Sequence, residues 1–516
     1  MLFARDKSPR RRLSRPSVVL VASILLGGTL AMAPSLQSQC VRLEDQKMVP
    51  SDTAPLDHFG HSLAMDGDVL LVSSHENGHN GVGSAGTVYA FRFDGTSWLE
   101  EQILSASDPA FLDFFGISVA LSGDVAIIGT PLQDDLGEDS GCVYVFRHDG
   151  SSWVEEQKFF AGDGGAGDEF GKYVAYDGNV AVIGAPGDDD AATDAGAFYV
   201  FGFDGVSWNE TQKLTAADGA TDDGFGDSLA VSGDVIVVGS PQDDDLGVES
   251  GSVYVFRFDG SAWSQEQKLT ASNGRARDRY GSSVDVLGET VVVGAPKNDS
   301  SFNNAGLVYI YLYEGSSWLL RRALFPRNGV VGDQCGTSVS LGPDSVAVGA
   351  VGGAEGGKAF LFRRNRNGWV DDFDLEPSDG LIGDSFAENL SLKGNVLVVG
   401  AGHKDDVGHA SGAAYVFNIP DIGLDADPEL VSAGDVLSLH SCGGVSAGLG
   451  VLAVKEVNSS PHFYRVAIGV FDNRGGWTVS ATIPPGLAGL RLGLESYGFS
   501  RNGSLVASNR VTVTCQ

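Results

Sequence analysis

The sequence has little cysteine and little positive charge, and each shortage excludes a class of protein. Five cysteines in 516 residues are too few for a scaffold built on disulfides. The 34 Lys and Arg residues stand against 67 Asp and Glu residues, and a formal net charge of −33 excludes nucleic acid and anionic lipid as partners. After residue 39 no stretch is apolar enough for a membrane helix, so no membrane span is predicted.

The one long apolar run lies at the N-terminus and indicates an export signal. Four arginines (Arg10, Arg11, Arg12 and Arg15) precede the apolar residues 18–30, a run too short to span a bilayer comfortably. Residues 1–39 are predicted to be a signal peptide. The mature protein is therefore expected to be secreted, periplasmic or attached to the cell surface, and to be a monomer.

The cysteines are distributed over separate parts of the chain. Cys142 and Cys335 lie inside different repeats and are expected to be buried thiols. Cys442 and Cys515 bracket the C-terminal region and are the candidates to join its two ends, which leaves Cys40 unpaired.

Glycine is abundant instead, at 71 residues, and it marks the turns of an internal repeat. A Phe-Gly pair or its variant recurs every 51 to 56 residues, at 59–60, 115–116, 170–171, 225–226, 280–281, 335–336 and 386–387. Thirteen residues after each second position comes a Gly-Ala-Pro-like triplet, clearest at Gly184-Ala185-Pro186. Seven copies in register predict seven structural units.

Each unit divides into four short strands separated by tight turns. In the second copy they are residues 117–121, 125–128 and 143–146 and a fourth that begins near Trp153. Four-stranded units in radial repetition predict an all-β, seven-bladed β-propeller over residues 40–418. The seventh copy lacks its fourth strand, and residues 43–48 match that strand (Leu-Glu-Asp-Gln-Lys-Met against Val-Glu-Glu-Gln-Lys-Phe), so the N-terminal segment is expected to close the ring.

The Phe-Gly pair, the triplet and the copy number resemble the FG-GAP repeat family, whose best-known members are the integrin α-subunit head propellers. The resemblance covers roughly residues 41–418 and implies a propeller that binds proteins or glycans outside the cell. Integrin-type repeats carry a calcium loop between their first two strands. Here that space holds only Ser-Gly-Asp, as at Ser122-Gly123-Asp124, which is too short to wrap a calcium ion, so those calcium sites are not carried over.

An aspartate precedes every Phe-Gly position by two residues. The seven are Asp57, Asp113, Asp168, Asp223, Asp278, Asp333 and Asp384. A residue present in every blade is expected to be a structural device that accepts hydrogen bonds from N–H groups of its own loop.

A second acidic feature lies in the loop after the triplet. Its carboxylates are Asp134, Asp135, Asp188, Asp189, Asp190, Asp243, Asp244, Asp245, Asp405 and Asp406. Adjacent carboxylates repel one another, and a Ca²⁺ ion bound by them would resolve that repulsion. These ten residues are the predicted metal ligands, and the alternative is a solvated acidic turn screened by salt. No other cofactor is expected.

If the Phe-Gly strand is innermost, the blade-to-blade connections and the acidic loops emerge on the same face, where a ligand or metal is expected. A tryptophan recurs once per blade (98, 153, 208, 263, 318 and 369) at the start of the fourth strand. It is expected to pack against its blade, and a carbohydrate-stacking ring is the alternative.

Beyond residue 418 the periodicity ends, and alternating runs such as residues 436–440 predict a small β-sandwich over residues 419–516. No nucleophile elbow, HExxH, P-loop or CxxC motif occurs, so no catalytic residue is assigned. Histidines gather in the first copy (58, 61, 75 and 79) and the seventh (403 and 409), and across a closed ring they could converge as a metal or acid–base site, with polar loop histidines as the alternative.

These features together predict a binding or adhesion protein for an extracellular protein or glycan. An extracellular polysaccharide hydrolase or lyase and a purely structural envelope component are the other hypotheses.

Overall fold

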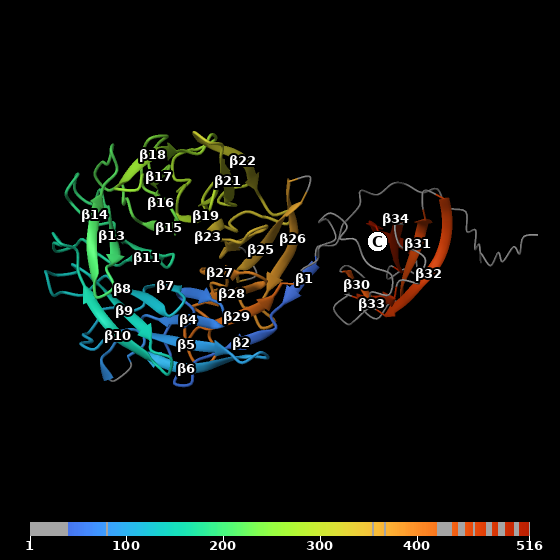
Figure 1. Ribbon diagram of the computed structural model, residues 1–516, viewed down its shortest axis with the longest axis horizontal. Helices are drawn as coiled ribbons and strands as arrows, with labels where there is room; N and C mark the ends of the chain where they lie inside the picture. The colour runs from blue at the N-terminus through green and yellow to red at the C-terminus, as the bar shows by residue number, and fades with distance from the viewer. Residues whose placement is uncertain are drawn as a thin grey trace, which may run out of the picture. The chain divides into compact units, whose positions relative to one another are not determined.

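A computed structural model of the chain describes residues 40–78, 81–352, 356–365 and 368–419, together with the backbone of six later strands. The described residues form strands and turns without a helix, so none of them provides a helix able to cross a membrane. Seven sheets stand radially around one axis, as Figure 1 shows, which confirms the predicted seven-bladed propeller.

Each blade follows one plan from its inner to its outer strand. The first four blades comprise β3 (Leu63–Asp66), β4 (Val69–Ser74), β5 (Thr87–Phe93) and β6 (Trp98–Leu104); β7 (Ser118–Ser122), β8 (Val125–Thr130), β9 (Cys142–His148) and β10 (Trp153–Phe159); β11 (Tyr173–Tyr176), β12 (Val180–Ala185), β13 (Ala197–Phe203) and β14 (Trp208–Leu214); and β15 (Ser228–Ser232), β16 (Val235–Ser240), β17 (Ser252–Phe258) and β18 (Trp263–Leu269).

Blades five to seven repeat this plan and include the two N-terminal strands. They comprise β19 (Ser283–Leu287), β20 (Thr290–Ala295), β21 (Leu307–Tyr313) and β22 (Trp318–Leu324); β23 (Cys335–Leu341), β24 (Ser345–Ala350), β25 (Lys358–Asn365) and β26 (Gly368–Glu376) with β1 (Cys40–Leu43) at the outer edge; and β27 (Leu390–Lys393), β28 (Val396–Ala401) and β29 (Ala413–Asn418) with β2 (Gln46–Met48) outermost.

Burial explains the residue types of the strands. Blades pack face to face, so the second strand is covered on both sides, and all six residues of β8 are buried, which suits its unbroken β-branched and small side chains. The outer strand has one covered face, and in β10 only Trp153 and Phe159, at its two ends, are fully buried. Cys142 and Cys335 are free buried thiols, as predicted, and burial raises the pKa of the Cys142 thiol to about 12.

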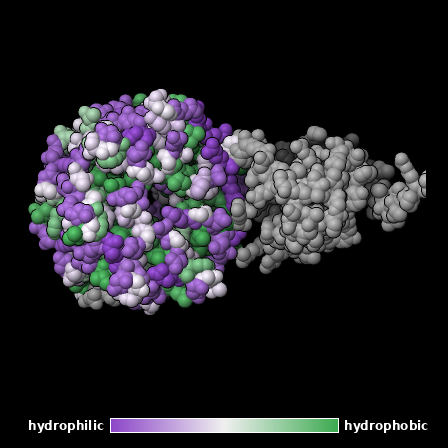
Figure 2. Space-filling view, in the orientation of Figure 1, coloured by the Kyte–Doolittle hydropathy of each residue, from purple (hydrophilic) through white to green (hydrophobic). Residues whose placement is uncertain are grey.

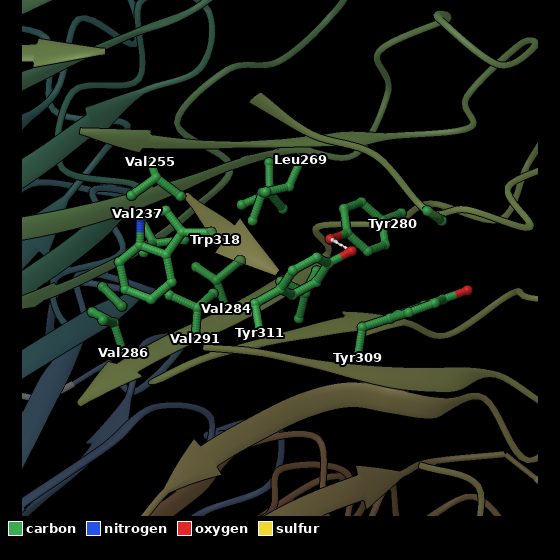
Figure 3. Packing of buried hydrophobic residues seen from close by; sticks show 14 of the residues in the cluster. Val237, Val255, Leu269, Tyr280, Val284, Val286, Val291, Tyr309, Tyr311 and Trp318 are labelled. Atoms are coloured by element: carbon green, nitrogen blue, oxygen red, sulfur yellow. Dashed lines mark hydrogen bonds between the residues drawn. The ribbon is translucent and has the colours of Figure 1, made fainter. Parts of the chain in front are cut away.

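The core of the ring consists of apolar layers between neighbouring blades. Figure 3 shows the layer between blades four and five, where Val237 and Val255 meet Trp318 of the next blade. At the other end of this layer the hydroxyl groups of Tyr280 and Tyr311 are hydrogen-bonded at 2.9 Å. The recurring tryptophans of blades one to five are buried (98, 153, 208, 263 and 318), which confirms a packing role for them.

The glycine of the Phe-Gly pair is required by close contact between blades. Gly171 has a φ of +94°, and a Cβ atom on it would lie 2.5 Å from the carbonyl oxygen of Cys142 in the preceding blade. Blade seven departs from the pattern, because Ala387 occupies this position with a φ of +69°.

At five of the seven junctions between blades, a glutamine side chain forms two hydrogen bonds with the backbone of a tryptophan in the next blade. We call this pair of hydrogen bonds the glutamine clasp. Gln157 donates from Nε2 to the Trp208 carbonyl oxygen (2.9 Å) and accepts the Trp208 N–H at Oε1 (2.8 Å). The same pair of hydrogen bonds joins Gln46 to Trp98, Gln102 to Trp153, Gln212 to Trp263 and Gln267 to Trp318. The glutamine and the tryptophan belong to adjacent blades, so the clasp fixes the rotation of one blade against the next.

The N-terminal segment closes the ring as predicted. Strand β2 pairs antiparallel with β29, with Lys47 opposite Tyr415, and supplies the missing outer strand of blade seven. Its Gln46 then clasps Trp98 of blade one, and Met48 joins a buried cluster that contains side chains of both blades. The first and last blades are thereby held by hydrogen bonds and by apolar contact.

The sequence did not indicate a second N-terminal contact, to blade six. Strand β1 adds in parallel to the outer edge of β26, with Cys40 opposite Phe373. Arg322 and Phe373 occupy the clasp position in blades five and six, so the two junctions of blade six have no glutamine clasp. Residues 40–48 therefore run from blade six to blade seven across one of these two junctions.

The C-terminal strands pair as two antiparallel sheets. Strand β30 (Val436–Ser441) pairs with β33 (Trp477–Thr482), and β32 (Ser460–Val470), β31 (Leu449–Val457), β34 (Arg491–Phe499) and β35 (Leu505–Thr514) form a four-stranded sheet in that order. The β-sandwich stays a prediction. The signal peptide, Cys442 and Cys515 lie outside the described residues.

Deletion of residues 40–48 is expected to lower the thermal unfolding midpoint of the propeller by 10 °C or more. The deletion exposes the edges of β26 and β29 and removes the Gln46–Trp98 clasp, so the outcome combines lost pairing with lost closure. Differential scanning calorimetry measures the transition, and Gln46→Met in the full-length chain separates the clasp from the strand. An unchanged midpoint in the deletion variant would contradict ring closure by this segment.

Candidate functional site

One face of the propeller carries both kinds of longer loop. The strands of each blade alternate in direction, so the blade-to-blade connection and the loop between the second and third strands emerge together, as predicted. We call this side the loop face. Backbone hydrogen bonds join the two kinds of loop, for example Phe170 N–H to the Ser140 carbonyl oxygen at 3.1 Å.

The aspartate before each Phe-Gly position organises its own loop. The side chain of Asp168 accepts the N–H of Gly165 at 2.7 Å, and Asp57, Asp113, Asp223, Asp278, Asp333 and Asp384 accept the N–H three residues earlier in the same way. Burial raises the pKa of Asp168. The structural role predicted for these seven residues is confirmed.

The acidic loops of blades two, three, four and seven surround a lysine of the same blade. In blade three the Lys213 Nζ atom lies 2.8 Å from Asp163, 2.7 Å from Asp188 and 2.6 Å from Asp190. In blade four Lys268 holds Asp218, Asp243 and Asp245 at 2.7 to 2.9 Å. Lys158 holds Asp135 in blade two, and Lys47 holds Asp406 in blade seven. The ammonium group supplies a positive charge where adjacent carboxylates would otherwise repel one another.

The other predicted ligands serve the loop backbone or a tyrosine. Asp189 accepts the N–H of Asp194 at 2.8 Å, and Asp134, Asp244 and Asp405 accept the N–H five residues later in the same way. Asp188 is only 3% exposed and accepts the Tyr199 hydroxyl at 2.9 Å. Each of the ten predicted ligands therefore has a lysine or a loop N–H as a partner, and Asp243 also accepts the Tyr254 hydroxyl.

The sequence contains a signal for the lysine that our prediction missed. The third loop position is Asp135, Asp190, Asp245 or Asp406 in the blades whose outer strand carries the lysine. In blade five this loop position is Ser300, and Ala323 replaces the lysine. The two positions change together because an ammonium group beside Ser300 would have no carboxylate partner.

Among residues 40–78, 81–352, 356–365 and 368–419, no group of three His, Cys, Asp or Glu side chains already has the spacing of a bound ion. The calcium site remains a prediction, and the loops of blade one at His79 and of blade six at 353–355 lie outside the described residues.

The mouth of the central channel differs from blade to blade. Two positions flank the Phe-Gly pair in each blade and lie at the start of the innermost strand, which places them near the central channel. The position before the Phe is His58, Phe114, Glu169, Gly224, Arg279, Gln334 or Ser385, and the position after the Gly is His61, Ile117, Lys172, Asp227, Ser282, Thr337 or Glu388. The scaffold repeats, but these side chains do not, so packing alone does not select them.

A cavity of about 530 Å³ opens at this mouth between blades three and four. Its charged lining is six carboxylates (Glu169, Asp194, Asp222, Asp227, Asp244 and Glu249) and one ammonium group, that of Lys172. Lys172 lies 2.6 Å from Glu169, and Arg279 at the rim lies 2.7 Å from Glu249. Burial and the neighbouring Asp189 and Asp222 raise the pKa of Asp194, so a positive charge would be favoured in this cavity.

A group of histidines occupies the mouth at the junction of blades seven and one. The ring centroids of His58 and His403 are 4.8 Å apart, those of His61 and His75 are 4.1 Å apart, and those of His58 and His75 are 5.7 Å apart. Closure of the ring therefore brings together four of the six histidines that the sequence singled out. His409 lies apart, 81% exposed and 3.2 Å from Asp405, and His79 is outside the described residues.

Burial lowers the pKa of His58, His61 and His75 and so favours their neutral form. It lowers the pKa of His61 to about 4 and that of His75 to about 2, with the neighbouring imidazoles adding to both shifts. The pKa of Glu388 is raised by burial, and its carboxylate lies 3.6 Å from Nδ1 of His403.

Lys213→Met is expected to lower the free energy of unfolding by about 3 kcal/mol, because it leaves the buried Asp188 carboxylate without its cation. Urea unfolding at neutral pH measures the change. Lys393→Met, which removes an exposed lysine, is the matched control and is expected to cost less than about 1 kcal/mol. Equal losses in the two variants would show that the lysine does not neutralise the loop.

Stability is expected to fall as the pH drops below about 6.5, the ordinary pKa of histidine. The folded-state pKa values of His61 and His75 lie below the unfolded value, so the unfolded chain binds protons first, and each residue contributes a slope of up to about 1.4 kcal/mol per pH unit. Urea unfolding between pH 7.5 and 4.5 is compared in the native chain and in His75→Asn. The variant is expected to show the shallower slope, since the carboxylates titrate alike in both chains, and parallel profiles would contradict a buried neutral His75.

Three solved structures are similar to this chain. A candidate 6-phosphogluconolactonase from Bacteroides uniformis is 12% identical, with a TM-score of 0.48 over 69% of this chain and 92% of that one. A second from Bacteroides fragilis is 12% identical, with a TM-score of 0.43 over 63% and 86%. The β-propeller domain of the Trilobed protease from Pyrococcus furiosus is 9% identical, with a TM-score of 0.39 over 66% and 90%. At these values none of them supports an inference about activity.

A family model described as the FG-GAP repeat matches the chain six times, at residues 43–91, 98–146, 153–201, 208–256, 263–311 and 369–417. Each match begins at or near the outer strand of one blade and ends in the third strand of the next blade. The repeat in the sequence is therefore shifted by one strand from the blade in the structure, and the same shift places the outer strand of blade seven at the N-terminus. The stretch between the last two matches, residues 312–368, contains the outer strand of blade five (β22) and β23, β24 and β25 of blade six. The matches cover more than half of the sequence, and this chain belongs to the FG-GAP repeat family.

Proposed function

We propose that this protein is an exported binding protein that recognises a positively charged group of an extracellular protein or glycan at the mouth of its propeller. The observation that carries the proposal is the cavity between blades three and four, where six carboxylates face one lysine. Residues 1–39 would direct export, and the binding domain would be the ring of residues 40–418.

The electrostatics of the cavity favour a cationic ligand. Asp194 and Asp222 have no ion pair among the described residues, and Asp222 is one of the carboxylates that raise the pKa of Asp194. A guanidinium or ammonium group would relieve this repulsion and form charge-assisted hydrogen bonds. The propeller face in view in Figure 2 is largely hydrophilic.

The scaffold supports specificity at this site. The loops around the cavity are fixed by two of the recurring aspartates, Asp168 and Asp223, and by hydrogen bonds between loops, so little chain entropy is lost on binding. The side chains at the mouth positions differ between blades. A ring of seven similar blades therefore has an asymmetric binding surface. Calcium would assist by occupying acidic loop positions that no lysine neutralises.

Binding is tested by screening the full chain without its signal peptide on arrays of glycans and of peptides, with millimolar calcium and with EGTA. Basic peptides or amino-sugar glycans are expected to bind, and their affinity is expected to fall with added salt. The variant Asp194→Asn/Asp222→Asn is expected to bind at least tenfold more weakly.

The matched control is Asp68→Asn/Asp124→Asn, which removes the same charge from the opposite face of the ring and is expected to bind as the native chain does. Equal binding by both double variants, or no cationic ligand at all, would contradict the proposal. A shift of the unfolding midpoint by calcium that EGTA reverses would support calcium assistance, and no shift would exclude it.

A further inference from the structure

Two loops meet on the loop face where blade seven adjoins blade one. The N–H group of His58 donates to the Ala410 carbonyl oxygen at 3.0 Å. We call the contact between residues 56–61 and residues 402–412 the closing contact. It joins the two ends of the ring, because these loops belong to the first and the last blade.

The backbone of the closing contact repeats at other junctions, but its side chains do not. Between blades two and three the N–H group of Glu169 donates to the Asp139 carbonyl oxygen at 3.0 Å in the same way. The closing contact differs from this one by four histidines, at positions that hold no histidine at any other junction. They are His58, His61 and His75 of blade one and His403 of blade seven.

The scaffold does not require these histidines. The position of His75 is a proline in blades two to five, at 131, 186, 241 and 296. The positions of His58 and His61 hold Glu169 and Lys172 in blade three, where the same loop forms. The chain thus concentrates at one contact the side chain whose ordinary pKa lies between pH 5 and 8.

The four imidazoles are packed against one another. Ring centroids are 4.8 Å apart for His58 and His403, 4.1 Å for His61 and His75, and 5.7 Å for His58 and His75. Imidazolium charges at such separations repel one another strongly where burial excludes water. The closing contact is therefore compatible with neutral rings and is destabilised by charged ones.

Two carboxylates face these imidazoles within the part of the chain that the structure describes. Glu76 lies 3.8 Å from Nε2 of His58 and 3.8 Å from Nε2 of His75. Glu388 of blade seven lies 3.6 Å from Nδ1 of His403. These distances are too long for hydrogen bonds, and two carboxylates cannot compensate four imidazolium ions.

The other neighbours do not add negative charge. Phe114 of blade two meets the ring of His75 edge-on, with centroids 5.5 Å apart. The imidazole of His409 in blade seven adds to the lowering of the pKa of His58, which burial dominates. The ammonium group of Lys404 is engaged by a buried carboxylate of its own blade.

The closed contact resists protonation. Burial lowers the pKa of His58, His61 and His75, and neighbouring imidazoles add to each shift. A separated contact exposes the rings to water, where their pKa is about 6.5. Each pH unit below that value therefore favours separation by up to about tenfold per histidine. Glu388 acts in the opposite direction, because burial raises its pKa, but it is one group against three.

We propose that the closing contact is a pH-sensitive device: in mild acid residues 56–61 separate from residues 402–412, while the other junctions of the ring stay closed. Separation opens the channel mouth on its histidine side and leaves the acidic cavity between blades three and four in place. The inference rests on the closing contact alone and is independent of the cationic ligand proposed above.

The experiment is hydrogen–deuterium exchange of the full chain without its signal peptide, measured by mass spectrometry at pH 7.5 and 5.0. Rates are corrected for the intrinsic pH dependence of amide exchange. Residues 56–61 and 402–412 are expected to lose protection by at least about 30-fold, the effect of one histidine 1.5 units below its ordinary pKa. Residues 167–172 and 131–141, the equivalent contact between blades two and three, are expected to keep their protection.

Variants assign the loss to the imidazoles. His58→Asn and His61→Asn each remove one titrating ring, and each is expected to reduce the loss of protection at pH 5.0 about tenfold. His148→Asn is the matched control, because this side chain is 16% exposed against 13% for His58 but lies on the opposite face. It is expected to leave the loss unchanged. Circular dichroism checks folding, and the comparison of the two junctions in the native chain needs no variant.

Full protection of the closing contact at pH 5.0 would overturn the proposal. Equal losses at the two junctions would also overturn it, since they would indicate general unfolding in acid. A loss that persists undiminished in both His58→Asn and His61→Asn would assign the pH dependence to other groups, and the device would not exist.

Discussion

The pairing of Gln46, Lys47 and Met48 with β29 is the contact on which the rest of the ring depends. It supplies the outer strand of blade seven, and through Gln46 and Trp98 it fixes blade seven against blade one. Without closure the inner strands would not surround a channel, and the mouth positions of blades seven and one would not meet. The same segment reaches blade six through β1, where the glutamine clasps are absent. One short stretch of chain thus supports the part of the ring that the repeat sequence supports least.

The repeat separates two kinds of residue that serve different purposes. Positions shared by all blades, such as the aspartate before Phe-Gly, satisfy backbone donors and build the loops. Positions that vary, such as Glu169 and His58, surround the channel mouth and give it an acidic side and a histidine side. The carboxylates of the acidic loops, which recur with their lysine in blades two, three, four and seven, also serve the scaffold. They face lysines of the outer strand, which explains how so acidic a loop is stable in a chain whose net charge is −33.

The fold could be predicted because every blade repeats the same local rules. The Phe-Gly spacing, the alternating strands and the displaced Leu43–Met48 segment gave blade number, strand order and closure directly from the chain. The role of the recurring aspartates and the packing of the tryptophans followed from their regularity. The candidate site was less predictable. The aspartates of the acidic loops were read as neighbours of one another, whereas Lys213 and its equivalents lie more than twenty residues away and meet them only through strand pairing. The second N-terminal contact had no sequence signal, since β1 has no counterpart in any repeat.

The sequence by itself determined the architecture, because periodic residues satisfy the same backbone and packing requirements in each blade. It also determined which residues were chemically able to act: the carboxylates, the histidines and the lysines were visible from the start. Only the tertiary structure decided which of them meet. The ring places His58 beside His403 across 345 positions of sequence and gathers carboxylates of blades three and four around one cavity. The physical reason is that distances across the channel mouth are set by closure, a property of all seven blades together and of no single repeat.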